Sequence, residues 1–230
     1  MDNYKEYSKN ICFIPVRKNS KEIQGKNMKE LAGRPLIWHI LQTVMSSEIA
    51  DEIWVATDWN YLKRYVKDTF GHKVQVFDRN PENAADASPT IDVVAEFIDK
   101  RDYAFSDNFI LLQATSPFTT KEELLELNSI LINDTHDSVV SCCRLKRFRW
   151  SDNGTSLDYN LKTKLRRQEY NGFLIESGSF YVSKIGLIKA TRQLLSGKIL
   201  PMEVSSEAFI ELDNALDWEL AEAIFRYKRM

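Results

Sequence analysis

The chain has 230 residues, of which 43% are hydrophobic and 28% are charged, and its formal net charge is -2. This length suits one well-filled α/β domain with a modest insertion, and the composition is that of a folded globular protein. The near-neutral charge argues against a non-specific nucleic-acid binder, and no apolar stretch reaches the roughly 18–20 residues of a membrane span. The polar N-terminus predicts no signal peptide, and three cysteines in apolar runs predict buried, reduced thiols in a cytoplasmic protein.

Short apolar runs alternate with helical patterns through the first two thirds of the chain. Strands are expected at 10–16, 52–57, 73–77 and 137–145, a strand that runs into a turn at 109–117, and helices at 35–46, 60–70, 88–100 and 119–132. Ser88 is the expected N-cap of the third helix, and Thr120 with Glu123 forms a capping-box pattern at the start of the fourth. Strands that alternate with helices predict a doubly wound α/β fold with a mostly parallel sheet.

This alternation stops at about Arg144. Residues 144–170 contain eight Lys or Arg against three Asp or Glu, with an SDNG turn in the middle. That composition indicates an excursion from the sheet, such as a long hairpin. The chain then returns through a strand at 177–184, a helix at about 186–195, an extended run at 199–213 and an amphipathic helix at 215–229.

The loop after the first strand is strongly basic. Residues 17–35 contain six Lys or Arg against two Glu. Because ligands of open α/β sheets bind beyond the carboxyl ends of the strands, cations at this position suit a polyanion such as a nucleoside triphosphate. The alternative is a solvated loop whose charges serve solubility. Neither a Walker A motif nor a GxGxxG fingerprint is present, so the generic phosphate motifs do not apply.

The order of residues in this loop says more than its charge. The segment RKNSKEIQGKN…LAGRPLI resembles the R-x-x-S-K-x-x-x-x-K-N…L-x-G-x-P-L-I pattern of the N-acylneuraminate cytidylyltransferase (CMP-sialic acid synthetase) family. Four later segments are also similar to that family: LQATSPF to its LQ-x-TSP segment, FRW with RRQEY to its dimer-forming insertion, ESGSFYVSK to its NGSFY strand, and IELDNALDWELAEA to its D-I-D…DW tail. The chain departs from the pattern at Glu22, Gln24, Ser177 and Glu211, where the family usually has Gly, Pro, Asn and Asp.

The resemblance implies a Rossmann-like nucleotidyltransferase domain over residues 1–230, with 144–170 as a small dimerisation insertion of a homodimer. It implies an enzyme that activates a nonulosonic (sialic-type) sugar acid with CTP, giving the CMP-sugar and pyrophosphate. One alternative is a cytidylyltransferase for another acid, of the Kdo, legionaminic or pseudaminic type. A second alternative, from a different class, is a catalytically silent relative that only binds nucleotide.

The resemblance also implies roles for individual residues. Those expected to bind the nucleotide are Arg17, Ser20, Lys21, Lys26, Asn27, Arg79 and Ser88, and those expected at the sugar acid are Arg167, Gln168 and Ser177. Gln113, Thr115 and Ser116 follow a buried strand, and from that position they are expected to orient the sugar-acid substrate or the nucleotide. Arg17, as a phosphate clamp, and Lys26, on the leaving-group side, are the expected catalytic residues, because fixed cations offset the charge that grows during nucleotidyl transfer. Turn formation before Pro117 is the alternative role for the polar residues of the LQATSP segment.

Two carboxylates near the C-terminus form a candidate metal site. Glu211 and Asp213 lie two apart between Ile210 and Leu212, and in a strand this spacing would place both on one face, about 7 Å apart at their α-carbons. Two hard oxygen donors beside a nucleotide suit Mg²⁺, which is therefore the expected cofactor. The alternative is the polar outer face of an amphipathic strand.

Overall fold

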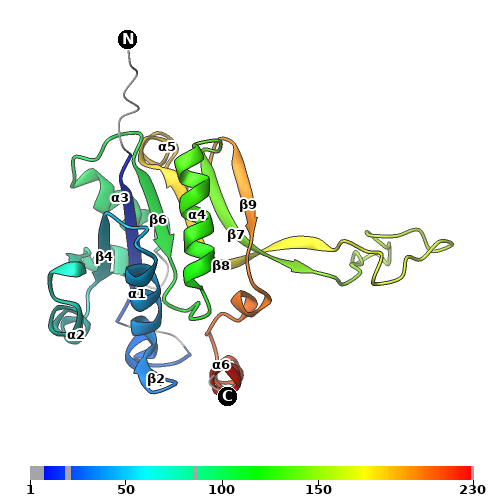
Figure 1. Ribbon diagram of the computed structural model, residues 1–230, viewed down its shortest axis with the longest axis horizontal. Helices are drawn as coiled ribbons and strands as arrows, with labels where there is room; N and C mark the ends of the chain where they lie inside the picture. The colour runs from blue at the N-terminus through cyan, green and yellow to red at the C-terminus, as the bar shows by residue number, and fades with distance from the viewer. Residues whose placement is uncertain (1–7, 19–21, 85–87, 229–230) are drawn as a thin grey trace, which may run out of the picture.

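The computed structural model of the protein describes residues 8–18, 22–84 and 88–228. Its centre is a seven-stranded sheet in the order β5-β4-β1-β6-β8-β7-β9 (Figure 1). The strands of this sheet are β1 (Asn10–Val16), β4 (Glu52–Thr57), β5 (Gln75–Asp78), β6 (Asn108–Leu112), β7 (Ser138–Leu145), β8 (Phe173–Lys184) and β9 (Ile199–Glu203). Strands β2 (Glu30–Leu31) and β3 (Arg34–Pro35) form a separate two-stranded sheet. The helices are α1 (Leu36–Ser47), α2 (Asn60–Phe70), α3 (Thr90–Asp99), α4 (Lys121–Asn133), α5 (Ile185–Thr191) and α6 (Ala215–Lys228), with short 3-10 helices η1 (Lys26–Met28), η2 (Gly71–Lys73), η3 (Pro81–Ala84) and η4 (Ser206–Phe209).

The sheet is mixed but mostly parallel, as the sequence predicts. Strand β1 pairs in parallel with β4 and β6, β4 with β5, and β7 with β9. Strand β8 runs antiparallel to both of its neighbours, β6 and β7. The chain passes from β1 to β4 on one side and later enters β6 on the other side of β1, so the strand order reverses beside β1. Such a switch point leaves a crevice beyond the carboxyl ends of the strands.

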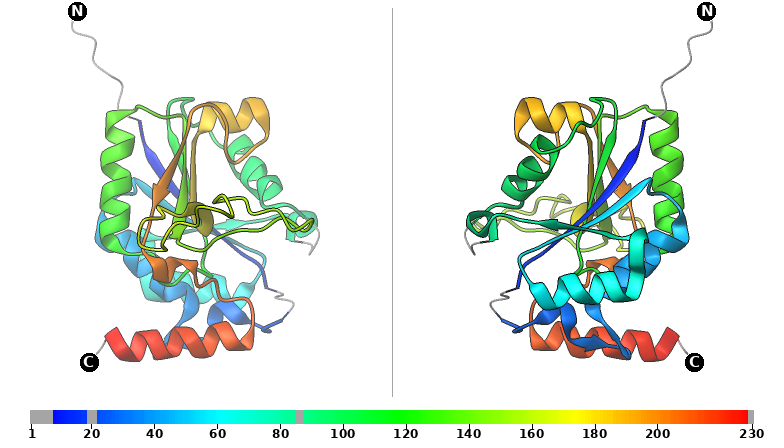
Figure 2. Two further views of the ribbon diagram at one scale, coloured as in Figure 1. Left: turned by 90° about the vertical axis from the view of Figure 1, so that its right-hand side faces the viewer. Right: turned by 90° about the vertical axis from the view of Figure 1, so that its left-hand side faces the viewer.

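Helices cover both faces of the sheet, which confirms the doubly wound arrangement (Figure 2). Alternate residues of β1 enter different cores because successive side chains of a strand point to opposite faces. Cys12 and Ile14 pack with residues of α1, α2 and α4, whereas Ile11 and Phe13 pack with residues of α3 and α5. A central strand that is buried on both faces explains why its sequence is a nearly continuous apolar run.

The start of α3 differs from the prediction. Thr120 and Glu123 form the expected capping box of α4, but Ser88 is not the N-cap of α3. Pro89 takes that position with an extended backbone, so the helix begins at Thr90. The Ser88 hydroxyl instead donates to the backbone oxygen of Glu82 at 2.6 Å, because it faces the preceding 3-10 helix rather than the helix that follows.

Residues 146–172 form an arm that extends from the body of the molecule (Figure 1). Strands β7 and β8 stay paired as far as Leu145 and Phe173, so the excursion begins and ends two residues later than the predicted 144–170. Within the arm, the Phe148 ring packs against Tyr159 and Tyr170, each at 4.9 Å between ring centroids. No arm residue belongs to a hydrophobic core cluster of the described chain, so the globular core does not hold the arm.

The C-terminal segment departs from the predicted extended run. Strand β9 ends at Glu203, and residues 210–214, between η4 and α6, belong to neither a strand nor a helix. Leu212 is nevertheless fully buried, in a small core cluster with residues that include Leu31 and Trp218. A buried Leu212 directs its neighbours on either side away from this core and toward the sheet edge.

The three cysteines, Cys12, Cys142 and Cys143, are buried free thiols, as the sequence predicts. Among the helices of the described residues, none is long and apolar enough to cross a membrane.

Candidate functional site

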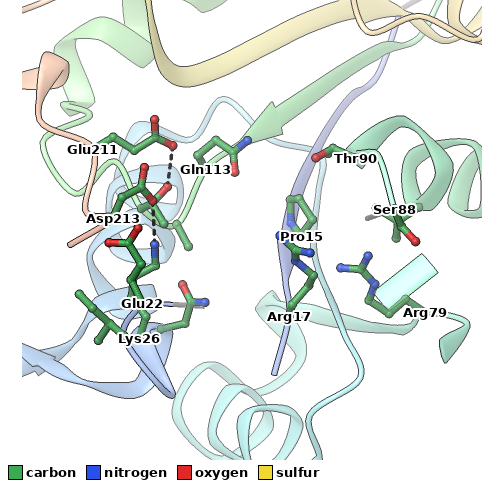
Figure 3. Close-up of a pocket in the computed structure, with 15 residues that line it drawn as sticks. Pro15, Arg17, Glu22, Lys26, Arg79, Ser88, Thr90, Gln113, Glu211 and Asp213 are labelled. Carbon is green, nitrogen blue, oxygen red and sulfur yellow. Dashed lines mark hydrogen bonds and ion pairs between the residues drawn. The ribbon is translucent and has the colours of Figure 1, made fainter. Parts of the chain in front are cut away.

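A cavity of about 420 Å³ lies at the carboxyl ends of the central strands (Figure 3). Arg17 follows β1, Arg79 follows β5 and Gln113 follows β6, and each lines the cavity. Residues of the opening loop and of η1, together with Glu211 and Asp213, also line it. The cavity therefore occupies the switch-point crevice, which the order of the strands alone predicts.

One wall of the cavity is cationic. The guanidinium groups of Arg17 and Arg79 lie on the same side in Figure 3. Burial lowers the pKa of the Arg79 guanidinium below its ordinary value, Asp58 opposes this shift, and repulsion from Arg17 adds to it. The buried Nε of Arg79 has no hydrogen-bond partner among the described residues. Two neighbouring guanidinium groups suit an anionic ligand.

Helix α3 holds the loop that carries Arg79. The Glu96 carboxylate accepts hydrogen bonds from the backbone N–H of Asn80 at 3.2 Å, from Asn83 Nδ2 at 2.7 Å and from Lys100 Nζ at 2.7 Å. Asn83 in turn accepts a hydrogen bond from Arg79 through its backbone oxygen. Burial by itself raises the pKa of Glu96, but the hydrogen bonds from Lys100 and Asn83 outweigh burial and hold that pKa below 4.5.

The opposite wall joins the opening loop to the C-terminal segment. Gly25 has a left-handed backbone (φ 64°), which lets the loop turn sharply into η1 and directs Lys26 inward. Lys26 is 8% exposed, and its Nζ donates to the Leu212 backbone oxygen at 2.5 Å and to Asp213 Oδ1 at 3.0 Å. Lys26 therefore places a fixed positive charge on the cavity wall and also anchors residues 212–213.

Glu211 lies beside Asp213 on the same wall (Figure 3). Its Oε1 accepts a hydrogen bond from Thr115 Oγ1 at 3.1 Å. Burial raises the pKa of Glu211 above 4.5, and repulsion from Asp213 raises it further, against the hydrogen bond from Thr115. A cation between two such carboxylates would relieve this repulsion.

This donor set fits a metal ion that binds few protein ligands. The described part of the chain has no group of three or more His, Cys, Asp or Glu residues that could hold a metal. Two carboxylates in a cavity wide enough for a nucleotide suit Mg²⁺, which usually takes one or two carboxylates and completes its shell with phosphate oxygens and water. Glu211 and Asp213 are thus chemically suited to the predicted cofactor. The prediction placed them in a strand, whereas residues 211–213 have no regular secondary structure.

The sequence also matches a known protein family. Residues 11–187 match the family described as cytidylyltransferase. The chain belongs to the cytidylyltransferase family. The matched range includes all of β1 but its first residue, the basic loop, Arg79 and the LQATSP segment, which contribute most of the cavity wall. Glu211 and Asp213 lie beyond this range.

Individual relatives are enzymes of named specificity. N-acylneuraminate cytidylyltransferase A of Danio rerio is 33% identical over 218 residues, covering 92% of this chain and 49% of that protein. CMP-N,N'-diacetyllegionaminic acid synthase of Legionella pneumophila is 29% identical over 226 residues, covering 93% of this chain and 95% of that protein. The chain thus spans about half the length of the first relative and nearly all of the second.

Solved structures share the fold of this family member. A CMP:2-keto-3-deoxy-manno-octonic acid synthetase, solved in complex with CTP, superposes with a TM-score of 0.71 at 18% sequence identity. The match covers 96% of this chain and 100% of that chain. At this identity the likeness shows the nucleotidyltransferase fold, which agrees with the Rossmann-like architecture that the sequence predicts.

The structure brings most of the predicted site residues together. Those that line the cavity are Arg17, Lys26, Asn27, Arg79, Ser88, Gln113, Thr115, Glu211 and Asp213. The amide oxygen of Asn27 is buried there without a hydrogen-bond partner among the described residues. Ser20 and Lys21 lie outside the described residues. The roles predicted for these residues remain predictions, but nine of them border one cavity.

Four predicted residues do not line this cavity. Ser116 is fully buried, and its backbone oxygen accepts a hydrogen bond from the Thr119 hydroxyl, which matches the turn-forming alternative. Ser177 is buried in β8, where its hydroxyl donates to the Ser141 hydroxyl of the neighbouring strand β7 at 2.8 Å. Arg167 and Gln168 lie on the arm, and Arg167 Nε donates to the Lys146 backbone oxygen at 3.1 Å.

Several cavity residues were not predicted. Thr90 and Val93 lie three apart in the first turn of α3, directly after Ser88, so the helical period could have identified them. Glu22 stands out in the sequence only as a departure from the family pattern, yet it lines the cavity beside Asp213 (Figure 3). Pro15, Ile23 and Ala114 also line it, and nothing in the sequence distinguishes them from ordinary loop or strand residues.

Proposed function

We propose that this protein transfers CMP from CTP to a nonulosonic (sialic-type) sugar acid and releases pyrophosphate. The observation that carries this proposal is the position of a cationic wall, Arg17 and Arg79, across the switch-point cavity from the Glu211–Asp213 carboxylates. A nucleoside triphosphate presents negative charge to one wall and binds divalent cations that suit the other. Family membership and the similarity to N-acylneuraminate cytidylyltransferases support the same reaction.

The residues of the chain account for orientation and charge in this reaction. The sugar hydroxyl would attack the α-phosphorus of CTP, and the bond from that phosphorus to the bridging oxygen would break as pyrophosphate leaves. Arg17 and Arg79 would hold phosphate oxygens in place, and Lys26 would offset charge that grows on the leaving group. Because Lys26 is buried and doubly hydrogen-bonded, its charge is positioned before the substrate arrives.

We propose Mg²⁺ as the cofactor. Glu211 and Asp213 would hold it, and when bound it would neutralise phosphate charge and lower the pKa of the attacking hydroxyl.

A second substrate is also supported. The legionaminic acid synthase from Legionella pneumophila matches along 95% of its length, whereas the Danio rerio enzyme matches along 49%. A legionaminic-type acid is therefore the second candidate. The nucleotide and the reaction would be unchanged.

The test is a pyrophosphate-release assay with CTP, Mg²⁺ and a panel of nonulosonic acids that includes sialic, legionaminic and pseudaminic types and Kdo. Turnover with one acid would identify the substrate. UTP and ATP serve as control nucleotides and should give no turnover. Binding of CTP without turnover on any acid would instead support a catalytically silent relative.

We further propose that the protein is a cytoplasmic homodimer that uses the arm as its dimerisation element. The buried free thiols agree with a reducing compartment. Trp150, Leu157, Leu161 and Leu165 on the arm are between 43% and 68% exposed, so they remain available to a second subunit. Arg167, which does not line the cavity of its own subunit, would then approach the sugar carboxylate in the neighbouring one.

Sedimentation tests the assembly. A species near twice 26.7 kDa at micromolar concentration supports the dimer, and one near 26.7 kDa contradicts it. A sharper test mixes two inactive variants, Lys26→Ala and Arg167→Ala. Mixed dimers with shared sites regain partial activity, and mixed dimers that stay inactive would refute the cross-subunit role of Arg167.

A further inference from the structure

We propose that Thr115 is a positioning residue whose hydroxyl fixes the Glu211 carboxylate in the cavity for cation binding, an inference that rests on the proposed cation site. The polar residues of the LQATSP segment are predicted to orient the sugar acid or the nucleotide, whereas the contacts of Thr115 point to the carboxylate wall, which is the cavity wall that carries Glu211 and Asp213. Thr115 contacts that wall twice, through its backbone oxygen and through its hydroxyl.

Residues 210–214 have no regular structure of their own to fix them. Leu212 is the anchor, since its side chain is fully buried and both of its backbone polar groups have partners. Its N–H donates to the Thr115 backbone oxygen at 2.9 Å, and its carbonyl oxygen accepts from Lys26 Nζ at 2.5 Å. Thr115 and Lys26 therefore hold the segment from two different loops.

The second contact of Thr115 reaches the carboxylate itself. Its Oγ1 donates to Glu211 Oε1 at 3.1 Å, which Figure 3 marks as a dashed line at Glu211. Gly178 of β8 also lies close to the carboxylate, since the methyl carbon of an alanine there would stand 3.1 Å from Glu211 Oε2. A hydroxyl donor and nearby glycine backbone thus both border the carboxylate, which restricts its orientation.

The proposed role predicts a specific loss when the hydroxyl is removed. Thr115→Val keeps the shape of the side chain but cannot donate, so the carboxylate of Glu211 becomes free to rotate. We expect this variant to bind Mg²⁺ about tenfold more weakly in the presence of CTP, the factor that corresponds to one hydrogen bond to a charged group. Thr115→Ser keeps the donor and should stay within about twofold of the wild type.

Thr119→Val is the matched control. Thr119 lies in the same turn, is 4% exposed and donates through its hydroxyl to the Ser116 backbone oxygen at 3.1 Å, but it does not line the cavity. Its replacement removes an equivalent hydrogen bond from the turn and should leave Mg²⁺ affinity unchanged. If Thr115 only stabilised the turn, both valine variants would lose Mg²⁺ affinity to a similar extent.

The experiment is a calorimetric titration of Mg²⁺ into protein saturated with CTP, without a sugar acid, so that no turnover contributes to the signal. A parallel titration of CTP in the presence of EDTA should give the same CTP affinity for wild type and Thr115→Val, because the cationic wall of Arg17 and Arg79 is unaltered. Equal Mg²⁺ affinity of wild type and Thr115→Val would overturn this inference alone. A wild type that binds CTP but no Mg²⁺ would overturn the proposed cation site as well.

Discussion

Lys26 offers the most direct test of the site, because the same ammonium group faces the cavity and anchors residues 212–213. Replacing it with alanine removes one fixed cation from the wall and two hydrogen bonds, at 2.5 Å and 3.0 Å. The two losses have different observable consequences. The first should appear in the rate of the reaction and the second in thermal stability.

The structure sets the size of each effect. Loss of one preorganised donor to transition-state charge lowers kcat by about 10²- to 10³-fold. Lys26→Ala also leaves the buried carbonyl of Leu212 without its partner, which costs about 1–3 kcal/mol. The ion pair adds little, since the Asp213 side chain is 64% exposed and exposed pairs contribute about 0–1 kcal/mol. In a chain of this size about 2 kcal/mol lowers Tm by about 4–8 °C.

Steady-state pyrophosphate release and differential scanning fluorimetry measure the two effects separately. Lys29→Ala is the matched control, because Lys29 carries the same charge in the same loop but is exposed and rests on the Trp218 ring, 4.2 Å from its centroid. It should keep kcat within about twofold. If Lys26→Ala retained kcat within about threefold while its Tm fell, Lys26 would be an anchor only and the charge argument would be refuted.

Three further predictions concern the carboxylate wall and the loop that carries Arg79. Asp213→Asn should abolish Mg²⁺-dependent turnover with little change in Tm, whereas Glu211→Asp, which restores the usual family residue, should retain most activity; equal Mg²⁺ titrations for wild type and Asp213→Asn would remove that residue from the site. Gly178→Ala should lower both Tm and Mg²⁺ affinity, because its methyl group would stand 3.1 Å from the Glu211 carboxylate at a φ of 75°, while Gly33→Ala, at a φ of 84° with nothing within 4 Å, should lower Tm alone. Glu96→Gln should raise the KM for CTP and destabilise the fold in urea at about pH 7; since the folded pKa of Glu96 lies below 4.5, this stability difference should shrink as the pH falls below that value, and a difference that grew instead would contradict the assignment.

The layered α/β fold is predictable from the sequence, because the signals for it are local. Strand β4 and helix α2 begin and end where the apolar period and the flanking polar residues predict. The Thr120–Glu123 capping box lies within four residues, so no distant contact can change it easily. The basic charge of the opening loop and its position after β1 were likewise readable, and they identified the edge of the sheet at which the cavity lies.

Local competition explains the smaller errors. Ser88 has the sequence context of an N-cap, but its hydroxyl donates instead to a backbone oxygen in the preceding 3-10 helix. Ser177 alternates correctly along β8, but the neighbouring strand supplies a serine partner for its hydroxyl. In both cases the serine could have formed a hydrogen bond with either of two partners. The observed partner depends on the position of a neighbouring element, which the local sequence does not predict.

The geometry of the carboxylate wall was decided by tertiary structure alone. The alternation of Ile210, Glu211, Leu212 and Asp213 is equally compatible with an amphipathic strand and with an irregular segment anchored by one buried leucine. The second occurs because the backbone of Leu212 bonds to Thr115 and to Lys26, which is 186 positions away, and not to a neighbouring strand. Such contacts depend on the relative positions of segments that are distant in the sequence, and a local sequence pattern carries no information about those positions.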